Sequence, residues 1–128
     1  MPPLLIHLHA EGYERAYQAL SLAVTARAMS QAVTLVLAFG ALRALAEDRL
    51  GEPLPGPDLW SAKRAENVGA PTVASLLANA RELGVQLWAC ETVAKTSGVE
   101  PEQLEGKLEL VGLPQIVRRQ QGAQLLYL

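Results

Sequence analysis

Short, mainly apolar runs alternate with segments of helical periodicity along this sequence. Five such runs stand out, at residues 4–9, 33–39, 85–90, 108–111 and 124–128. Continuous runs of this kind are typical of strands that are buried on both faces, as in a parallel sheet. Between the first two runs, apolar residues recur every three or four positions, which predicts an amphipathic helix from Tyr13 to about Met29.

Further helices are predicted between the other strands, and the whole pattern indicates an α/β protein. They are expected over residues 41–50, 71–83, 91–98, 101–104 and 114–121, and Gly84 is well placed to end the second of them. Strands that alternate with right-handed helical connections form a parallel sheet covered on both faces. With 128 residues, the chain is predicted to be one domain, residues 1–128, with a mainly parallel five-stranded sheet.

Residues 52–69 differ from the rest of the chain. Pro53, Pro55, Gly56 and Pro57 interrupt regular structure, and the residues that follow are mostly polar. We interpret this segment as a long connection without regular structure. Such connections often act as lids or contact surfaces, and a solvated excursion is the alternative.

The composition excludes several classes of protein. A formal net charge of −2 offers no broad attraction to nucleic acid or to anionic membranes. The longest uncharged run in the apolar middle of the chain, residues 28–42, is too short to span a bilayer, and no signal peptide is evident at the N-terminus. One cysteine cannot form an intramolecular disulfide. We therefore expect a soluble cytoplasmic protein with no nucleic-acid or membrane partner.

Cys90 is the first candidate functional residue, because it stands where a strand meets a short helix. Ligands of parallel α/β proteins gather at the carboxyl ends of the strands, where His9 and Phe39 are also expected. A helix N-terminus stabilises a thiolate. Glu91, next to the cysteine, disfavours a second negative charge there, and Lys95 offsets this effect only if it faces the sulfur. The alternative is that Cys90 is an inert, buried apolar residue.

Two histidines share one side of the first strand, because alternate residues of a strand face the same way. His7, His9 and Cys90 are three possible zinc ligands, but the chain has no CxxC or HExxH spacing, and we predict no metal site. A His9–Cys90 pair, in which the imidazole tunes the thiol, is the preferred hypothesis. Glu11 and Glu14 stand where a glycine-rich phosphate loop would be, so no nucleotide and no other cofactor is predicted.

The order of these segments resembles the DsrE/DsrF-like family of small sulfur-relay proteins, some of which are labelled predicted peroxiredoxins. The most specific part is residues 84–99, in which a helix-ending glycine, a strand, the cysteine and a short helix follow one another. The opening strand, the alanine-rich first helix, the 33–39 strand before Gly40 and the tail from Leu104 are also similar.

The resemblance implies a three-layer α/β/α fold and assembly into homo-oligomers, usually trimers or hexamers. It also implies that Cys90 accepts a persulfide sulfur from a donor protein and passes it to an acceptor protein. Our leading hypothesis is therefore a cytoplasmic persulfide carrier, or sulfurtransferase-like protein, that uses Cys90. The alternatives are a single-cysteine thiol peroxidase, in which Cys90 becomes a sulfenic acid, and a non-catalytic oligomeric scaffold with an inert Cys90. Self-association is also expected because so small a surface rarely hides this much Leu, Val and Ala.

Overall fold

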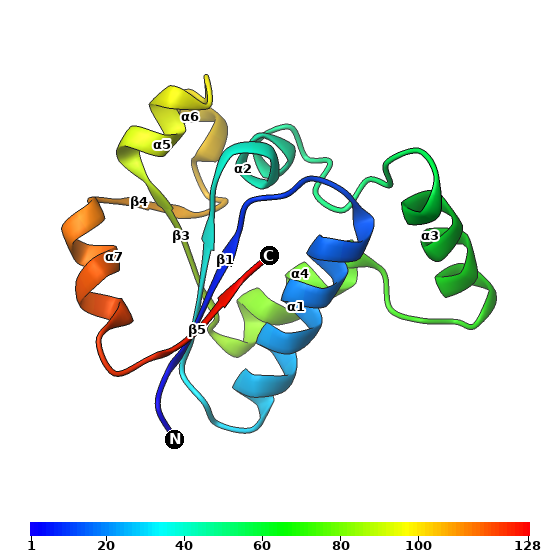
Figure 1. Ribbon diagram of the computed structural model, residues 1–128, viewed down its shortest axis with the longest axis horizontal. Coiled ribbons are helices and arrows are strands. Elements are labelled where there is room, and N and C mark those ends of the chain that lie inside the picture. The colour runs from blue at the N-terminus through cyan, green and yellow to red at the C-terminus, as the bar shows by residue number, and fades with distance from the viewer.

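The computed structural model describes residues 1–128 and contains one five-stranded sheet with helices on both faces (Figure 1). The strands are β1 (Leu4–Leu8), β2 (Val33–Leu37), β3 (Gln86–Cys90), β4 (Glu109–Val111) and β5 (Gln124–Tyr127). The helices are α1 (Tyr13–Ala28), α2 (Phe39–Ala46), α3 (Pro57–Asn67), α4 (Val73–Leu83), α5 (Glu91–Thr96), α6 (Pro101–Leu104) and α7 (Leu113–Gln120). Every strand and every helix expected from the sequence is present, and α3 is an additional helix that was not expected.

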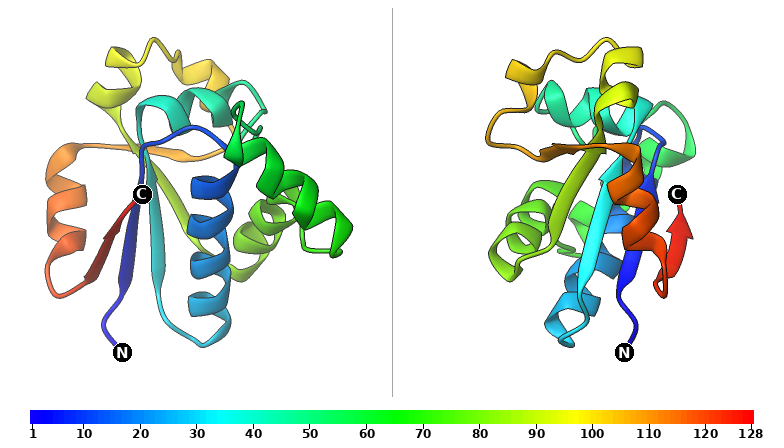
Figure 2. Two further views of the ribbon diagram at one scale, coloured as in Figure 1. Left: turned by 45° about the vertical axis from the view of Figure 1, so that its right-hand side comes forward. Right: turned by 90° about the vertical axis from the view of Figure 1, so that its left-hand side faces the viewer.

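The sheet is parallel throughout and has the strand order β4-β3-β2-β1-β5. The chain steps outward from β1 to β4 and then returns to the far side of β1 to add β5. Because right-handed connections change face when the direction of stepping reverses, α7 lies on the opposite face from α1 and α4 (Figure 2). The predicted three-layer α/β/α architecture is confirmed.

Each face of the sheet has its own apolar cluster, because successive side chains of a strand point to opposite faces. The larger cluster joins one face of the sheet to α1, α2 and α4, and Leu8 of β1 and Leu20 of α1 are fully buried in it. The smaller cluster lies under α7. Its members are Leu5, Val36, Trp88, Cys90, Val111 and Ile116. Cys90 therefore belongs to the α7 face, together with the side chains of His7 and His9.

The interpretation of residues 52–69 as a connection without regular structure is wrong, because Pro57–Asn67 forms α3. Pro57 occupies the first turn, where its missing N–H and fixed φ do not disturb a helix. Gly56, with φ 92°, turns the chain just before it. Residues 52–56 and 68–69 remain outside regular structure, and Pro57 marks the start of a helix rather than its absence.

Asp58 of α3 caps the N-terminus of α1, although the two residues it meets there are far away in the sequence. Its Oδ2 accepts hydrogen bonds from the N–H groups of Tyr13 and Leu54, and its Oδ1 accepts one from Glu14, all at 2.7 Å. Burial raises the pKa of the Asp58 carboxyl, but the three backbone donors outweigh it and hold the pKa below its ordinary value. The residue before α1 is Gly12, which has no side chain to provide a cap.

The junction between β2 and α2 also differs from the sequence-based expectation. The helix begins at Phe39 and ends at Ala46, whereas residues 41–50 were predicted, and Gly40 lies inside the helix instead of separating it from the strand. Phe39 has φ 45°, which turns the chain directly from the strand into the helix.

Gly84 is confirmed as the end of α4, with a left-handed φ of 87°. None of the helices combines the length and the apolar character required to cross a bilayer.

Candidate functional site

A cavity of about 340 Å³ lies between the sheet and α7, at the carboxyl ends of the strands. It is lined by His7, His9, Val36, Leu37, Ala38, Phe39, Cys90, Val93, Leu113, Ile116, Val117, Gln120 and Tyr127. These residues come from β1, β2, β3 and β5, from α2, α5 and α7, and from the positions directly after β1 and β2. No charged side chain is among them. The structure brings His9, Phe39 and Cys90 together at this edge of the sheet, as the sequence predicted.

Cys90 is the last residue of β3 and directly precedes α5. Its thiol is free, only 6% of the residue is exposed, and the residue lines the cavity. Glu91, which follows the cysteine in the sequence, is exposed and does not line the cavity, and the same is true of Lys95, which therefore does not face the sulfur. The surroundings of the thiol are thus apolar and aromatic, with two imidazoles at the same cavity.

His7 is buried and held between two partners. Its Nε2 lies 2.8 Å from the Oε1 of Gln120 on α7, and its ring stacks on that of Tyr127 with the centroids 4.4 Å apart. Burial lowers the pKa of His7, the hydrogen bond with Gln120 opposes this, and the nearby His9 adds to the lowering. Burial therefore favours the neutral form of His7, and the Gln120 amide oxygen accepts a hydrogen bond from the tautomer that carries its proton on Nε2.

His9 is exposed and stands next to three aromatic rings. Its ring centroid lies 6.1 Å from that of His7, 6.3 Å from Phe39 and 6.4 Å from Tyr127, each in an edge-to-face arrangement. The predicted pair, His9 and Cys90, does line one cavity, but no hydrogen bond joins the thiol to either imidazole. No three His, Cys, Asp or Glu side chains come together in a way that would hold a metal ion.

The contribution of α7 to this cavity was missed from the sequence, although the helix itself was predicted. Its lining residues are Leu113, Ile116, Val117 and Gln120. Their spacing of three, four and seven positions places them on one side of a helix, which is the signal that would have revealed a shared surface. What the spacing alone does not show is which face of the sheet this side of α7 covers.

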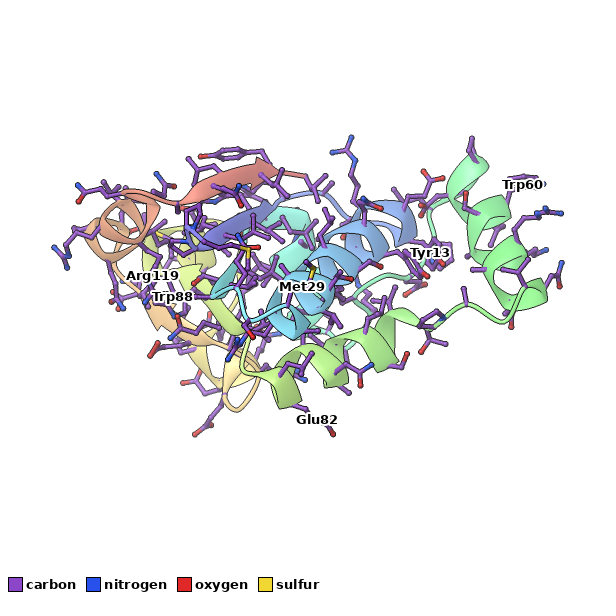
Figure 3. The ribbon with its side chains drawn as sticks, turned by 90° about the horizontal axis from the view of Figure 1, so that it is seen from below. Tyr13, Met29, Trp60, Glu82, Trp88 and Arg119 are labelled. Atoms are coloured by element: carbon purple, nitrogen blue, oxygen red, sulfur yellow. The ribbon has the colours of Figure 1, made fainter.

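A polar cluster holds α7 to the sheet near the amino ends of β2 and β3, away from the cavity. The guanidinium of Arg119 lies 4.3 Å from the ring centroid of the buried Trp88, and it donates hydrogen bonds to Thr34 Oγ1 at 2.7 Å and to Gln86 Oε1. Figure 3 shows Arg119 and Trp88 side by side beneath α7. A cation placed over an indole is attracted by the ring, so the cluster fixes α7 and with it one wall of the cavity.

A second and larger hollow, of about 640 Å³, lies between α1 and α3. Tyr13, Tyr17, Trp60 and Arg64 are among its lining residues, and Arg64 lies 5.4 Å from the Trp60 ring centroid. It contains no cysteine or histidine. Residues 52–69 form no lid over Cys90, since none of them lines its cavity, and Trp60 of α3 lies at the opposite end of the molecule from Arg119 of α7 (Figure 3).

Comparisons with known proteins agree on one family and one fold. The sequence model of the DsrE/DsrF-like family matches residues 4–126. The crystal structure of the YchN protein from E. coli is similar with a TM-score of 0.68 and 19% identity, over 100% of both chains.

Two further solved structures are similar. The protein of unknown function MTH1491 from Methanobacterium thermoautotrophicum has a TM-score of 0.55 and 20% identity over 100% of both chains. The conserved protein of unknown function BT1422 from Bacteroides thetaiotaomicron has a TM-score of 0.57 and 11% identity over 97% of this chain and 94% of its own. At such identities these likenesses establish the fold alone. No curated protein sequence matches the chain.

Proposed function

Because this chain belongs to the DsrE/DsrF-like family, we propose that it is a sulfur-relay protein in which Cys90 carries a persulfide. The activity would be that of a sulfur carrier, or of a sulfurtransferase, with one protein as sulfur donor and another as acceptor. The resemblance described above supplies the reaction class, and the cavity supplies the residues.

The proposed reaction is an exchange of one sulfur atom and involves no net oxidation or reduction. The Cys90 sulfur attacks the terminal sulfur of a donor persulfide. A new S–S bond forms at Cys90, the S–S bond of the donor breaks, and the proton of the Cys90 thiol ends on the donor thiolate. Transfer to the acceptor is the same step in reverse, so a single cysteine is sufficient.

One observation carries this proposal: the single cysteine of the chain lines a cavity of about 340 Å³ together with two histidines. Within it, the exposed His9 is the residue we assign to receive the thiol proton, since an imidazole nitrogen can act as the base that activates a thiol. His7 is less suited to that role, because Gln120 and Tyr127 hold its ring and burial disfavours its charged form.

The decisive experiment is the intact mass of the protein after incubation with a low-molecular-weight persulfide donor. We expect a gain of one sulfur, about 32 Da, in the wild type and no gain in Cys90→Ser, since only a thiolate forms the persulfide. Cyanide should remove the added sulfur as thiocyanate. His9→Gln should slow the uptake without preventing it.

The other outcomes distinguish the alternatives. A sulfenic acid at Cys90 after peroxide treatment, with no uptake from persulfide donors, would favour a single-cysteine thiol peroxidase. A Cys90 that neither takes up sulfur nor is alkylated in the folded protein would leave a non-catalytic scaffold. Either outcome would end the relay proposal.

We also infer that the protein is a homo-oligomer, and β5 gives the structural support for this. β5 is an edge strand, its four residues are all exposed, and residues 122–128 contain no charge and no proline that would protect the edge. An apolar edge of this kind is a ready template for pairing between chains. A monomer in sedimentation at micromolar concentration would contradict the inference.

A further inference from the structure

Phe39 occupies a backbone conformation that an aromatic residue rarely adopts. Its φ of 45° lies in the left-handed region, where steric contact with the Cβ atom is costly for every residue except glycine. Hydrogen bonds on both sides fix the turn, since the N–H of Ala38 donates to the carbonyl of Leu8 at 3.0 Å and the N–H of Ala41 to that of His9 at 3.1 Å. The chain therefore requires this conformation, and glycine would suit it best.

Folding does not account for a phenylalanine at this position. Phe39 belongs to neither apolar cluster of the protein, and 41% of the residue is exposed. The glycine that follows it, Gly40, has an ordinary φ and is needed for a different reason: a Cβ there would lie 2.7 Å from Cγ of Glu11 and 3.2 Å from its backbone N. The sequence thus places a glycine where space is short and a phenylalanine where the backbone favours glycine.

The Phe39 side chain lies at the cavity of Cys90. It lines that cavity, is partly exposed, and meets the ring of His9 edge-to-face at 6.3 Å, so it stands at the mouth. Three more apolar side chains line the cavity while remaining half-exposed or more: Leu113, Val117 and Tyr127. Strained residues that the surrounding structure holds in place concentrate at ligand clamps and active sites.

We propose that Phe39 is a specificity-determining residue of this cavity, and that its strained backbone holds the aromatic ring at the mouth so that only slender groups reach Cys90. The proposal deepens the proposed function, on which its biological meaning rests: the sulfur must arrive on a narrow, unbranched group, such as the side chain of a cysteine persulfide. Branched or bulky thiol compounds are excluded by size.

The test compares two alkylating reagents on the only thiol of the chain. Iodoacetamide is small, whereas a pyrene maleimide is flat and bulky. The rate at which each reagent alkylates Cys90 is followed by intact mass. We expect Phe39→Gly to raise the ratio of the maleimide rate to the iodoacetamide rate by about tenfold, the order by which an apolar pocket discriminates between ligands of different size. Glycine suits φ 45°, so the urea midpoint of this variant should not fall below that of the wild type.

Two further variants separate the ring from the backbone. Phe39→Asn retains a residue that tolerates the left-handed region but removes the ring, and it should raise the ratio as Phe39→Gly does. Ser30→Gly relieves a similar φ of 69° at an exposed turn outside the cavity, and it should leave the ratio unchanged.

The proposal is overturned if the ratio does not rise in Phe39→Gly, if it rises in Phe39→Gly but not in Phe39→Asn, or if Ser30→Gly raises it equally. The measurement needs no sulfur donor. A failure of Cys90 to take up sulfur would therefore refute the relay function and leave this result standing, and the reverse holds as well.

Discussion

Replacement of Asp58 by Asn tests whether α3 is held to the body of the protein by the cap that it provides for α1. The carboxylate accepts three hydrogen bonds of 2.7 Å from backbone N–H groups. An amide of the same shape retains one acceptor oxygen, turns an NH₂ donor towards the remaining N–H, and removes the charge. A hydrogen bond to a charged group contributes about 1.5–3 kcal/mol, and loss of an N-cap costs about 1 kcal/mol. We expect Asp58→Asn to lower the free energy of unfolding by roughly 2 kcal/mol.

The assay is urea unfolding beside a matched control, Asp48→Asn. Asp48 is 79% exposed, and its carboxylate meets only Lys107 Nζ, at 3.0 Å. Asn tolerates its φ of 57°, and an exposed ion pair contributes less than about 1 kcal/mol, so the control should change little. Amide hydrogen exchange at Tyr13 and Glu14 should accelerate in Asp58→Asn alone. Equal losses of stability in the two variants would refute the reasoning.

The stabilisation by Asp58 also has a defined pH dependence. Its pKa in the folded protein lies below the ordinary value of 3.8, so the unfolded chain binds the proton more readily. The contribution is present above pH 3.8 and is lost as the pH falls through the lower folded value. The difference between wild type and Asp58→Asn should accordingly shrink only in that acidic range, and a difference that disappears near neutral pH would contradict the assignment.

Two further predictions concern His7, which lines the cavity, and Arg119 of α7, which does not. His7 has a folded pKa below its ordinary value of 6.5, so the stability associated with its neutral form is present above pH 6.5 and declines as the pH falls below it. The urea midpoint should therefore fall between pH 7 and pH 5 in the wild type, and it should fall less in His7→Gln. Parallel pH profiles of the two proteins would count against the burial argument. Arg119→Met removes the cation over Trp88 and the donor to Thr34 and Gln86, which should cost about 1–3 kcal/mol in urea unfolding and change the fluorescence of the buried Trp88. An unchanged midpoint would show that α7 is held by its apolar contacts alone.

The α/β fold was predictable because its signals are local. Strands buried on both faces read as continuous apolar runs, as in Val33–Leu37, and helices read as a three- to four-residue period. The position of Cys90 between a strand and a short helix follows from the same local pattern. The error at Pro57–Asn67 arose because proline disfavours a helix interior but favours its first turn, and the sequence pattern does not state which position a proline occupies.

The sequence by itself determined the five strands and every helix except α3, the parallel sheet that they build, and the shared edge at which Cys90 and His9 lie. Tertiary structure alone decided the rest. The reversal of strand order after β4 decides which face of the sheet α7 covers. The position of α7 in turn brings Gln120 within hydrogen-bonding distance of His7 and places four α7 residues in the cavity lining. The cap from Asp58 to α1 and the left-handed turn at Phe39 depend on contacts between segments far apart in the chain. Propensity and periodicity act over a few residues, whereas these features exist only once the sheet has closed and brought distant backbone groups within hydrogen-bonding distance.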